Sequence, residues 1–496
     1  MNARNAEGEA VRANVSRREF IRVGATGLGA IGALGALPAA ARGEAARVGR
    51  PRAVGPIRVV QTTGALRHAE RPALAWSPAG NGPPGEITLF PERRAQEVLG
   101  FGAALTDAAC YTVDQLPAGA RAELFHELYH PSEMAFSVGR TCIGSSDYST
   151  VAYSYDDSPT PDPELKNFSI AHDRKWILPM LRQARAVNPD LWLLSSPWSP
   201  PGWMKDKNSL LGGTVRRRYL ANYADYFTRF VKAYASEGVA INSVTSQNEV
   251  DTDQDSRMPQ CTWPQEIEVE FVGKHLGPAF AKAGLATKIW LIDHNYNLWG
   301  RALAELQDDD VRRYADGIAW HGYLGSPEEM TRVHDAYPGK HAYWTEGGPD
   351  ITAPDYQTDW TKWAGTFTGI MRNWARCIIA WNVALDEHGK PNIGPFPCGG
   401  VVTIHSATKQ ITRSGQYWAF AHFSRHVKRG AHVFQSTGSV EGVAHVAFQN
   451  PDGSRVLVLA NGAKGAVQSR ISLGDASVQL SLPTDSVTTL DWPSQA

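Results

Sequence analysis

Short apolar runs alternate with longer segments of helical period through the middle of the chain, from about residue 100 to residue 384. The apolar runs predict eight strands: 98–104, 135–143, 191–196, 239–246, 288–293, 317–321, 342–346 and 378–382. The helical segments between them include 173–187, 217–236, 264–283, 327–336 and 359–376. This alternation predicts a (β/α)8 TIM barrel. A doubly wound open sheet is the alternative, but the glycine-rich phosphate turn usual in that fold is absent.

The pattern changes after Val401, where no useful helical period is seen. Short strands are predicted at 443–448, 454–460, 466–472, 478–481 and 486–490, with turn residues between them such as Asn450-Pro451-Asp452-Gly453. We expect a side β-sandwich domain that N-terminal strands also join. The predicted organisation is N-terminal sandwich strands at 57–97, the catalytic barrel at 98–400 and the C-terminal sandwich domain at 401–496.

The first residues read as a targeting segment. Arg17 and Arg18 precede a run of small apolar residues at 23–37, and Ala39-Ala40-Ala41 supplies a cleavage site. We therefore predict a twin-arginine signal peptide at 1–41 and a linker at 42–56. The predicted location is the periplasm or the extracellular space, with no stable membrane insertion after the signal is removed.

The amino-acid composition indicates which classes of binding partner are favoured. The 49 basic and 50 acidic residues nearly cancel, so no field steers nucleic acid or an anionic membrane to the chain. The chain has 16 each of Trp, Tyr and Phe, which usually fill cores but also stack on sugars, so they lean towards a carbohydrate partner. The five cysteines match no metal pattern, and no phosphate loop or HExxH motif is found. We expect no cofactor and no metal requirement, and the sequence does not indicate the oligomeric state.

Two glutamates stand where barrel enzymes carry their chemistry. Glu249 follows the fourth predicted strand and Glu346 ends the seventh, and catalytic groups of (β/α)8 enzymes lie at such C-terminal strand ends. Glycoside hydrolysis needs two carboxyl groups, one to protonate the leaving oxygen and one to attack the sugar or activate water. Repulsion and burial are expected to keep one protonated and the other ionised. Either glutamate alone would more often be an ordinary loop residue.

Motifs around these residues carry a resemblance to a known family. They lie at 101–109, 196–205, 247–249, 319–323 and 381–385, together with Glu346. In combination they resemble glycoside hydrolase family 30, the family of lysosomal glucosylceramidase and of bacterial and fungal β-glycanases. The resemblance covers about Gly100 to the C-terminus. It implies a barrel with a side β-sandwich and a retaining mechanism.

The resemblance also implies roles for single residues. Glu249 matches the acid/base, Glu346 the nucleophile and Asn248 the residue that binds the sugar 2-hydroxyl. Asp107 and Trp198 match residues that hold the sugar on the non-reducing side. For Asp107 an N-cap role is equally open.

The remaining matches surround the nucleophile and the sugar. Trp381 and Asn382 would border the sugar, although core packing is more common for a single tryptophan. Tyr323, after His321 on the sixth strand, would donate to Glu346. Arg140 would lie below that carboxylate, where its charge would keep the nucleophile ionised.

The chain departs from the family pattern beside the acid/base. Val250 stands where proline is common, and residues 251–256 are unusually acidic. This segment lies where contacts with the leaving group are expected. The departure bears on the leaving-group side of the site more than on the chemistry.

The leading prediction is a β-glucosidase of the glucosylceramidase type, a reaction of sphingolipid metabolism. Asp107 and Trp198 favour a pocket that closes over a terminal sugar. Alternatives are an endo-β-1,6-glucanase, a β-xylosidase and a β-fucosidase. A catalytically inactive carbohydrate-binding protein is a different class, against which the presence of both glutamates argues. A lyase or aldolase would need a Schiff-base lysine or a metal cluster at the strand ends, and the predicted strand ends carry neither.

Overall fold

A closed barrel of eight parallel strands forms the larger part of the protein. The computed structural model describes residues 55–78, 86–252 and 257–493. The barrel strands follow the chain in order: β5 (Gly100–Ala104), β6 (Val138–Cys142), β7 (Trp192–Ser196), β8 (Ser243–Thr245), β9 (Lys288–Asn295), β10 (Ala315–His321), β11 (His341–Glu346) and β12 (Ala375–Ala380). Pairing of β12 with β5 closes the ring. All eight predicted barrel strands are confirmed. Their near-continuous burial explains why the strands read as short, largely apolar runs.

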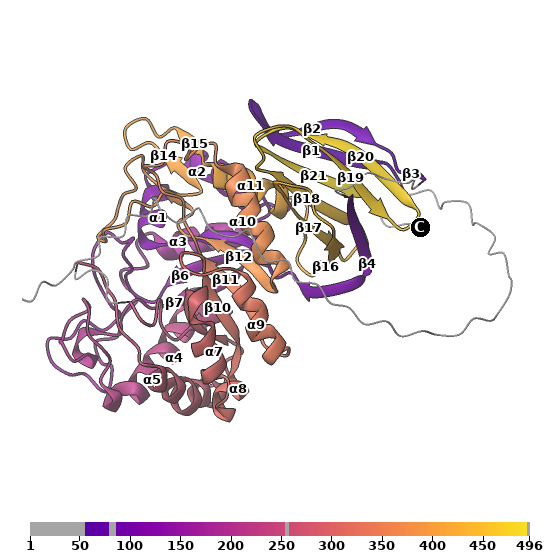
Figure 1. The fold of residues 1–496 in the computed structure, drawn as a ribbon. Helices are drawn as coiled ribbons and strands as arrows, with labels where there is room; N and C mark the ends of the chain where they lie inside the picture. The colour runs from indigo at the N-terminus through magenta and orange to yellow at the C-terminus, as the bar shows by residue number, and fades with distance from the viewer. Residues whose placement is uncertain (1–54, 79–85, 253–256, 494–496) are drawn as a thin grey trace, which may run out of the picture. The chain divides into compact units, whose positions relative to one another are not determined.

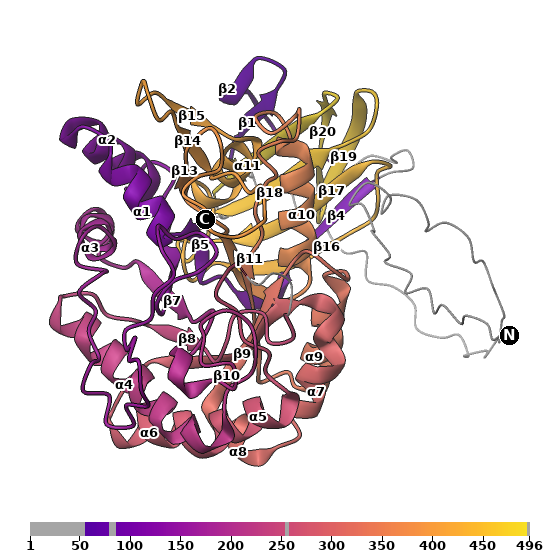
Figure 2. The same cartoon turned by 90° about the vertical axis from the view of Figure 1, so that its left-hand side faces the viewer.

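Helices connect successive strands and cover the outside of the barrel (Figures 1 and 2). They are α1 (Asp107–Asp114), α2 (Ala118–Tyr129), α3 (Ile177–Val187), α4 (Leu220–Ser236), α5 (Gln265–Glu270), α6 (Gly277–Lys282), α7 (Trp299–Glu305), α8 (Asp309–Tyr314), α9 (Glu328–Ala336) and α10 (Trp360–Arg372). A π-helical turn, η3 (Phe271–Leu276), joins α5 to α6. The helices α3, α4 and α10 bury one apolar face each, the arrangement that their helical period predicts.

Strands from both ends of the chain share the second sheet. Its N-terminal members are β1 (Ile57–Thr63), β2 (Leu66–Leu74), β3 (Ser77–Pro78) and β4 (Glu86–Glu97), and its C-terminal members are β16 (His432–Thr437), β17 (Val443–Gln449), β18 (Arg455–Asn461), β19 (Val467–Leu473), β20 (Ala476–Leu482) and β21 (Ser486–Trp492). β1 pairs with β21, and β4 lies between β16 and β19. Figure 1 shows the indigo and yellow strands interleaved. The predicted sandwich of both termini is confirmed.

A segment between the barrel and the sandwich was not expected. It holds a small sheet of β13 (Ala384–Leu385), β14 (Val402–Ile404) and β15 (Ile411–Arg413), followed by the helix α11 (Gly415–Ser424). The expectation of no helix after Val401 is therefore wrong. α11 is buried on nearly every side, so its sequence shows no polar face from which a helical period could be read.

The helices α10 and α11 also carry hydrogen bonds to the sandwich. The Trp360 indole donates to the Asp485 carbonyl at 3.1 Å, and Arg372 Nη1 donates to the Ser436 carbonyl at 3.3 Å. The buried His422 ring lies 2.8 Å from the Thr62 hydroxyl and 2.9 Å from that of Thr489. Two helices of the barrel side thus anchor strands from both ends of the chain.

The predicted signal peptide at 1–41 lies outside the residues that the structure describes, as does the predicted linker apart from residues 55 and 56. Within the described ranges, no helix is long and apolar enough to cross a membrane.

Candidate active site

Glu346 is the last residue of β11, and two side chains hold its carboxylate. Arg140 on β6 donates from Nη1 to Oε2 at 2.5 Å, and the Tyr323 hydroxyl donates to Oε1 at 3.1 Å. Arg140 is fully buried, whereas Tyr323 is 36% exposed at the rim. A permanent charge therefore holds one oxygen of the carboxylate and a phenol holds the other, while the roles that the resemblance implied for these two residues in catalysis stay predictions.

Glu249 lies in the loop after β8, with an unusual backbone conformation. Its φ is +53°, in the left-handed region that costs non-glycine residues energy. Its backbone N–H donates to the Asp293 carbonyl at 3.0 Å, and Thr252 Oγ1 donates to its Oε2 at 3.0 Å. These bonds hold the strained turn, and the turn directs the carboxylate inwards.

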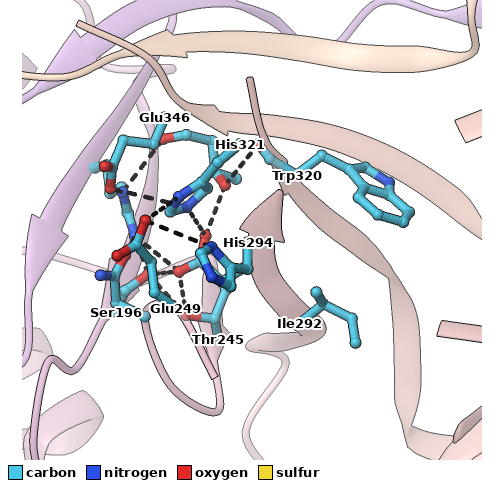
Figure 3. Close-up of polar contacts among 12 residues, drawn as sticks. Ser196, Thr245, Glu249, Ile292, His294, Trp320, His321 and Glu346 are labelled. Carbon is cyan, nitrogen blue, oxygen red and sulfur yellow. Dashed lines mark hydrogen bonds and ion pairs between the residues drawn. The ribbon is translucent and has the colours of Figure 1, made fainter. Parts of the chain in front are cut away.

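One imidazole joins the two glutamates. His321, the last residue of β10, lies with Nδ1 3.4 Å from Glu249 Oε1 and with Nε2 3.8 Å from Glu346 Oε2. Figure 3 shows the ring between the two carboxylates. Burial lowers the pKa of His321, but Glu346, Asp293 and Glu249 outweigh it and raise the pKa to about 9. The ring therefore carries a proton at neutral pH, in contact with both candidate catalytic groups.

Asp293 is the central acceptor of the site, and the sequence analysis did not single it out. Its Oδ2 accepts hydrogen bonds from Arg140 Nη2 at 2.8 Å and from the Ser196 and Thr245 hydroxyls at 2.7 Å each. Its Oδ1 accepts from Thr345 Oγ1 at 2.6 Å and lies 3.1 Å from His321 Nε2. Burial raises its pKa, but the Arg140 charge and these hydrogen bonds hold the pKa far below the usual range.

A distortion of β9 sets the position of Asp293. Ile292 and Asp293 have φ values of +71° and +48°, and the pairing of β9 with β10 shifts register there. A residue inserted in this way changes the direction of the following side chain. Asp293 is the last residue of a predicted strand, so a carboxylate at a strand end was the signal that could have found it.

His294, on the Glu249 side, was also missed, and it contacts Asp251 of the acidic segment. His294 Nδ1 lies 3.4 Å from Glu249 Oε1, and its Nε2 lies 2.6 Å from Asp251 Oδ1. Burial raises the pKa of Glu249, but His321, His294 and Thr252 together outweigh it, and the pKa falls below the usual range. The expectation that burial and repulsion keep this carboxyl protonated is therefore wrong for the resting site, because sequence reasoning did not place two histidines beside it.

The predicted sugar-contacting tryptophans pack on each other. Trp198 and Trp381 stack with ring centroids 5.1 Å apart and planes 20° apart. The Arg140 guanidinium lies 4.9 Å from the first ring centroid and 5.4 Å from the second. Arg140 Nη2 also donates to Asn248 Oδ1 at 2.7 Å. Both tryptophans are almost fully buried, so they form a wall that positions Arg140.

Asp107 and Asn382 are engaged inside the protein. Thr106 is the N-cap of α1, so the N-cap role considered for Asp107 is wrong. Asp107 Oδ2 accepts from the N–H and hydroxyl of Thr150, and Oδ1 accepts from the Trp176 indole at 2.5 Å and lies 2.9 Å from His172 Nε2. Asn382 is fully buried and accepts from the Thr106 hydroxyl at 2.9 Å. Sugar contacts for these two residues stay predictions.

A closed barrel that brings carboxylates from its fourth and seventh strand ends against one imidazole is the architecture of a glycoside hydrolase. The family model of the glycosyl hydrolase family 30 TIM-barrel domain matches residues 98–427, and that of the family 30 beta sandwich domain matches residues 430–490. The chain therefore belongs to glycosyl hydrolase family 30.

Relatives of two kinds resemble it. An endo-1,6-beta-D-glucanase of Neurospora crassa is 34% identical over 77% of this chain and 84% of its own length. The lysosomal acid glucosylceramidase of Mus musculus is 27% identical over 82% of this chain and 84% of its own length. Among solved structures, an endo-beta1,6-glucanase matches with a TM-score of 0.81 at 30% identity, covering 88% of this chain and 100% of that one.

Proposed function

We propose that this protein is an endo-β-1,6-glucanase that works by double displacement with retention. Three fungal enzymes named endo-1,6-beta-D-glucanases are 31–34% identical to this chain. A solved endo-beta1,6-glucanase is 30% identical to it. Relatives named glucosylceramidases are 27–30% identical. The similarity thus favours the glucanase alternative over the glucosylceramidase-like reading that the sequence analysis put first, and this preference carries the proposal.

In this mechanism Glu346 is the nucleophile. Arg140 and Tyr323 hold its carboxylate in a fixed orientation, and orientation is what a group attacking the anomeric carbon requires. Glu249 is the acid/base, and the His321 proton lies against its Oε1. Asn248, held through its Oδ1 by Arg140, is the residue assigned to the sugar 2-hydroxyl, a contact that strengthens as positive charge develops on the sugar.

The contacts of Asp107 weaken the case for an enzyme that acts on terminal residues. A pocket that closes over a terminal sugar would need the Asp107 carboxylate to be free to accept hydrogen bonds from two sugar hydroxyls. That carboxylate is 2% exposed and engaged with Thr150, His172 and Trp176. A sugar hydroxyl could reach it only if one of these partners moved, so the reason for preferring terminal-residue action is weakened.

Digestion of β-1,6-glucan followed over time tests the proposal. We expect a ladder of oligosaccharides early in the reaction, and no products from a Glu346→Gln variant purified in parallel. Release of glucose alone would point to a terminal-residue glucosidase. If the enzyme hydrolyses glucosylceramide, nitrophenyl xylosides or nitrophenyl fucosides and leaves the polymer intact, β-1,6-glucan is not its substrate. NMR of the first product must show the β-anomer; a first-formed α-anomer would overturn retention.

Export by the twin-arginine route is the second part of the proposal, and it rests on Arg17 and Arg18 ahead of the small apolar run. Replacing both arginines with lysine should leave the enzyme in the cytoplasmic fraction. A control protein in which Arg12 is replaced with lysine should be exported normally. If the double variant is exported at the normal rate, another route carries the protein.

A further inference from the structure

The Glu249 side of the active site holds three potential metal ligands that face one another. Glu249, His294 and His321 each offer one atom, and these atoms all lie within 4.8 Å of one another. Figure 3 shows both imidazole rings turned towards the Glu249 carboxylate. All three residues are buried, so little solvent competes for the space between them.

The two distances from the histidines to Glu249 match those between ligands of one metal ion. His294 Nδ1 and His321 Nδ1 each lie 3.4 Å from Glu249 Oε1, which is long for a hydrogen bond. Two atoms bound to a tetrahedral zinc ion at its usual bond lengths lie roughly 3.3–3.4 Å apart. The buried Nδ1 of His294 has no hydrogen-bond partner, although it points at the carboxylate. The cluster therefore has both the spacing and an unsatisfied nitrogen that suit a metal ion.

The outer nitrogens of both rings are held as metal-binding histidines usually are. His294 Nε2 lies 2.6 Å from Asp251 Oδ1, and His321 Nε2 lies 3.1 Å from Asp293 Oδ1. An ionised carboxylate can only accept a hydrogen bond, so the Nε2 atom of each imidazole ring must carry a proton to donate. Nδ1 is then the nitrogen that a metal takes, displacing any proton held there. The carboxylates orient both rings and raise their strength as ligands.

The surrounding charge favours a dication. Four carboxylates, those of Glu249, Glu346, Asp251 and Asp293, surround the cluster, whereas the cations beside them are Arg140, which pairs with two of them, and His321, whose Nδ1 proton the metal would replace. Two imidazoles and one carboxylate suit zinc and its neighbours, and not magnesium or calcium, which prefer oxygen ligands. The half-exposed Asp251 side chain brings the outer side of the His294 ring close to solvent.

We propose that Glu249, His294 and His321 form a zinc-binding site that switches this enzyme off. Zinc held by three protein ligands keeps a fourth position for water, and Glu249 bound to the metal can neither give nor take a proton. Binding itself depends only on the three ligands. The inhibition rests on the acid/base role proposed above for Glu249.

Cobalt titration tests binding without any substrate. His126 and His130 lie one helical turn apart with stacked rings, and such a pair also binds transition metals, so a His126→Gln protein is the parent for all measurements. We expect one Co²⁺ per chain, with the visible d–d absorption of a four- or five-coordinate ion that Zn²⁺ abolishes. His294→Ala should lose the band, and Asp251→Asn should weaken binding about 10-fold. Equal affinity and equal spectra in the parent and in both variants would overturn the site.

Inhibition is measured separately with β-1,6-glucan. Zn²⁺ should stop hydrolysis by the parent, a chelator should restore it, and Mg²⁺ at the same concentration should have no effect. In Asp251→Asn the inhibition should require about 10-fold more Zn²⁺, which a loss of structure would not produce. Full activity in the zinc-saturated parent would refute the switch. If the parent cleaves no glycoside at all, the proposed function fails while the cobalt spectrum still decides the metal site.

Discussion

Arg140 and Glu346 form a buried ion pair of 2.5 Å between the second and seventh strands of the barrel. The same guanidinium contacts Asp293 at 2.8 Å, and Arg140 has no exposed surface. One guanidinium thus pairs with two carboxylates in the floor of the site, so the residue that orients the nucleophile is also one on which the fold depends.

Replacing this cation should therefore destabilise the protein strongly. Arg140→Met removes the guanidinium that pairs with both Glu346 and Asp293 and leaves only His321 as a cation beside them, and we expect the free energy of unfolding to fall by about 3–5 kcal/mol. Denaturant unfolding measures the loss. The control is Arg93→Met, which removes a surface pair with Glu92 and should change stability by less than about 1 kcal/mol. Equal effects of the two substitutions would contradict the central role of Arg140.

Tyr323→Phe should impair catalysis and leave the fold intact. The substitution removes the 3.1 Å hydrogen bond to Glu346 Oε1 from a side chain that is 36% exposed. A hydrogen bond to a charged group contributes about 1.5–3 kcal/mol, so kcat/KM should fall about 10- to 150-fold. Thermal unfolding of the variant should match that of the parent. A kcat/KM within twofold of the parent value would show that the phenol does not act on the nucleophile.

Azide rescue should separate the roles of the two glutamates. In Glu249→Ala the nucleophile remains, and azide enters in place of the acid/base to give the β-glycosyl azide from an activated aryl glycoside. In Glu346→Ala azide attacks from the side of the missing nucleophile and should give the α-azide. NMR of the products identifies the anomers. The reverse pattern would exchange the two assignments.

Acid should destabilise the protein through histidines that are buried in the sandwich and where α11 contacts it. Burial lowers the pKa of His68 to about 3 and that of His445 to about 4, and it holds the pKa of His422 well below the usual value. Because the unfolded chain takes up these protons near pH 6.5, stability should fall as the pH drops from 6.5 towards 4. The slope is at most about 1.4 kcal/mol per pH unit for each histidine.

Unfolding measured across that pH range tests this linkage. His422→Gln should flatten the dependence, whereas His388→Gln, which alters a largely exposed ring, should not. Parallel slopes for the wild type and His422→Gln would show that the buried ring does not cause the acid sensitivity.

The barrel and its two glutamates could be read from the sequence because each depends on a local signal. Strands such as β7 and β9 are buried along nearly their whole length, which produces continuous apolar runs. Glu249 and Glu346 follow or end such runs, and barrel geometry alone brings strand ends to one rim.

The rest of the site depends on geometry that the sequence does not carry. His294 faces Glu249 after the left-handed residues Ile292 and Asp293, and neither of these is a glycine or asparagine that would announce a bulge. Asp107 matched a sugar-binding position, yet its hydrogen bonds go to Thr150, His172 and Trp176, which lie 43–69 residues away in sequence. The sequence pattern indicates which residues have suitable chemistry, but the hydrogen-bond partners of these residues depend on the three-dimensional structure.

The pairing of β1 with β21 has a consequence for the newborn chain. The Gln61 side-chain amide donates a hydrogen bond to the Thr488 hydroxyl, which lies 427 residues later in the sequence. During translation β1 leaves the ribosome long before its neighbour exists, so its edge stays open until synthesis is nearly finished. The second sheet is therefore completed only after release, and until then the edge of β1 that pairs with β21 stays open, although β2 can already cover its other edge.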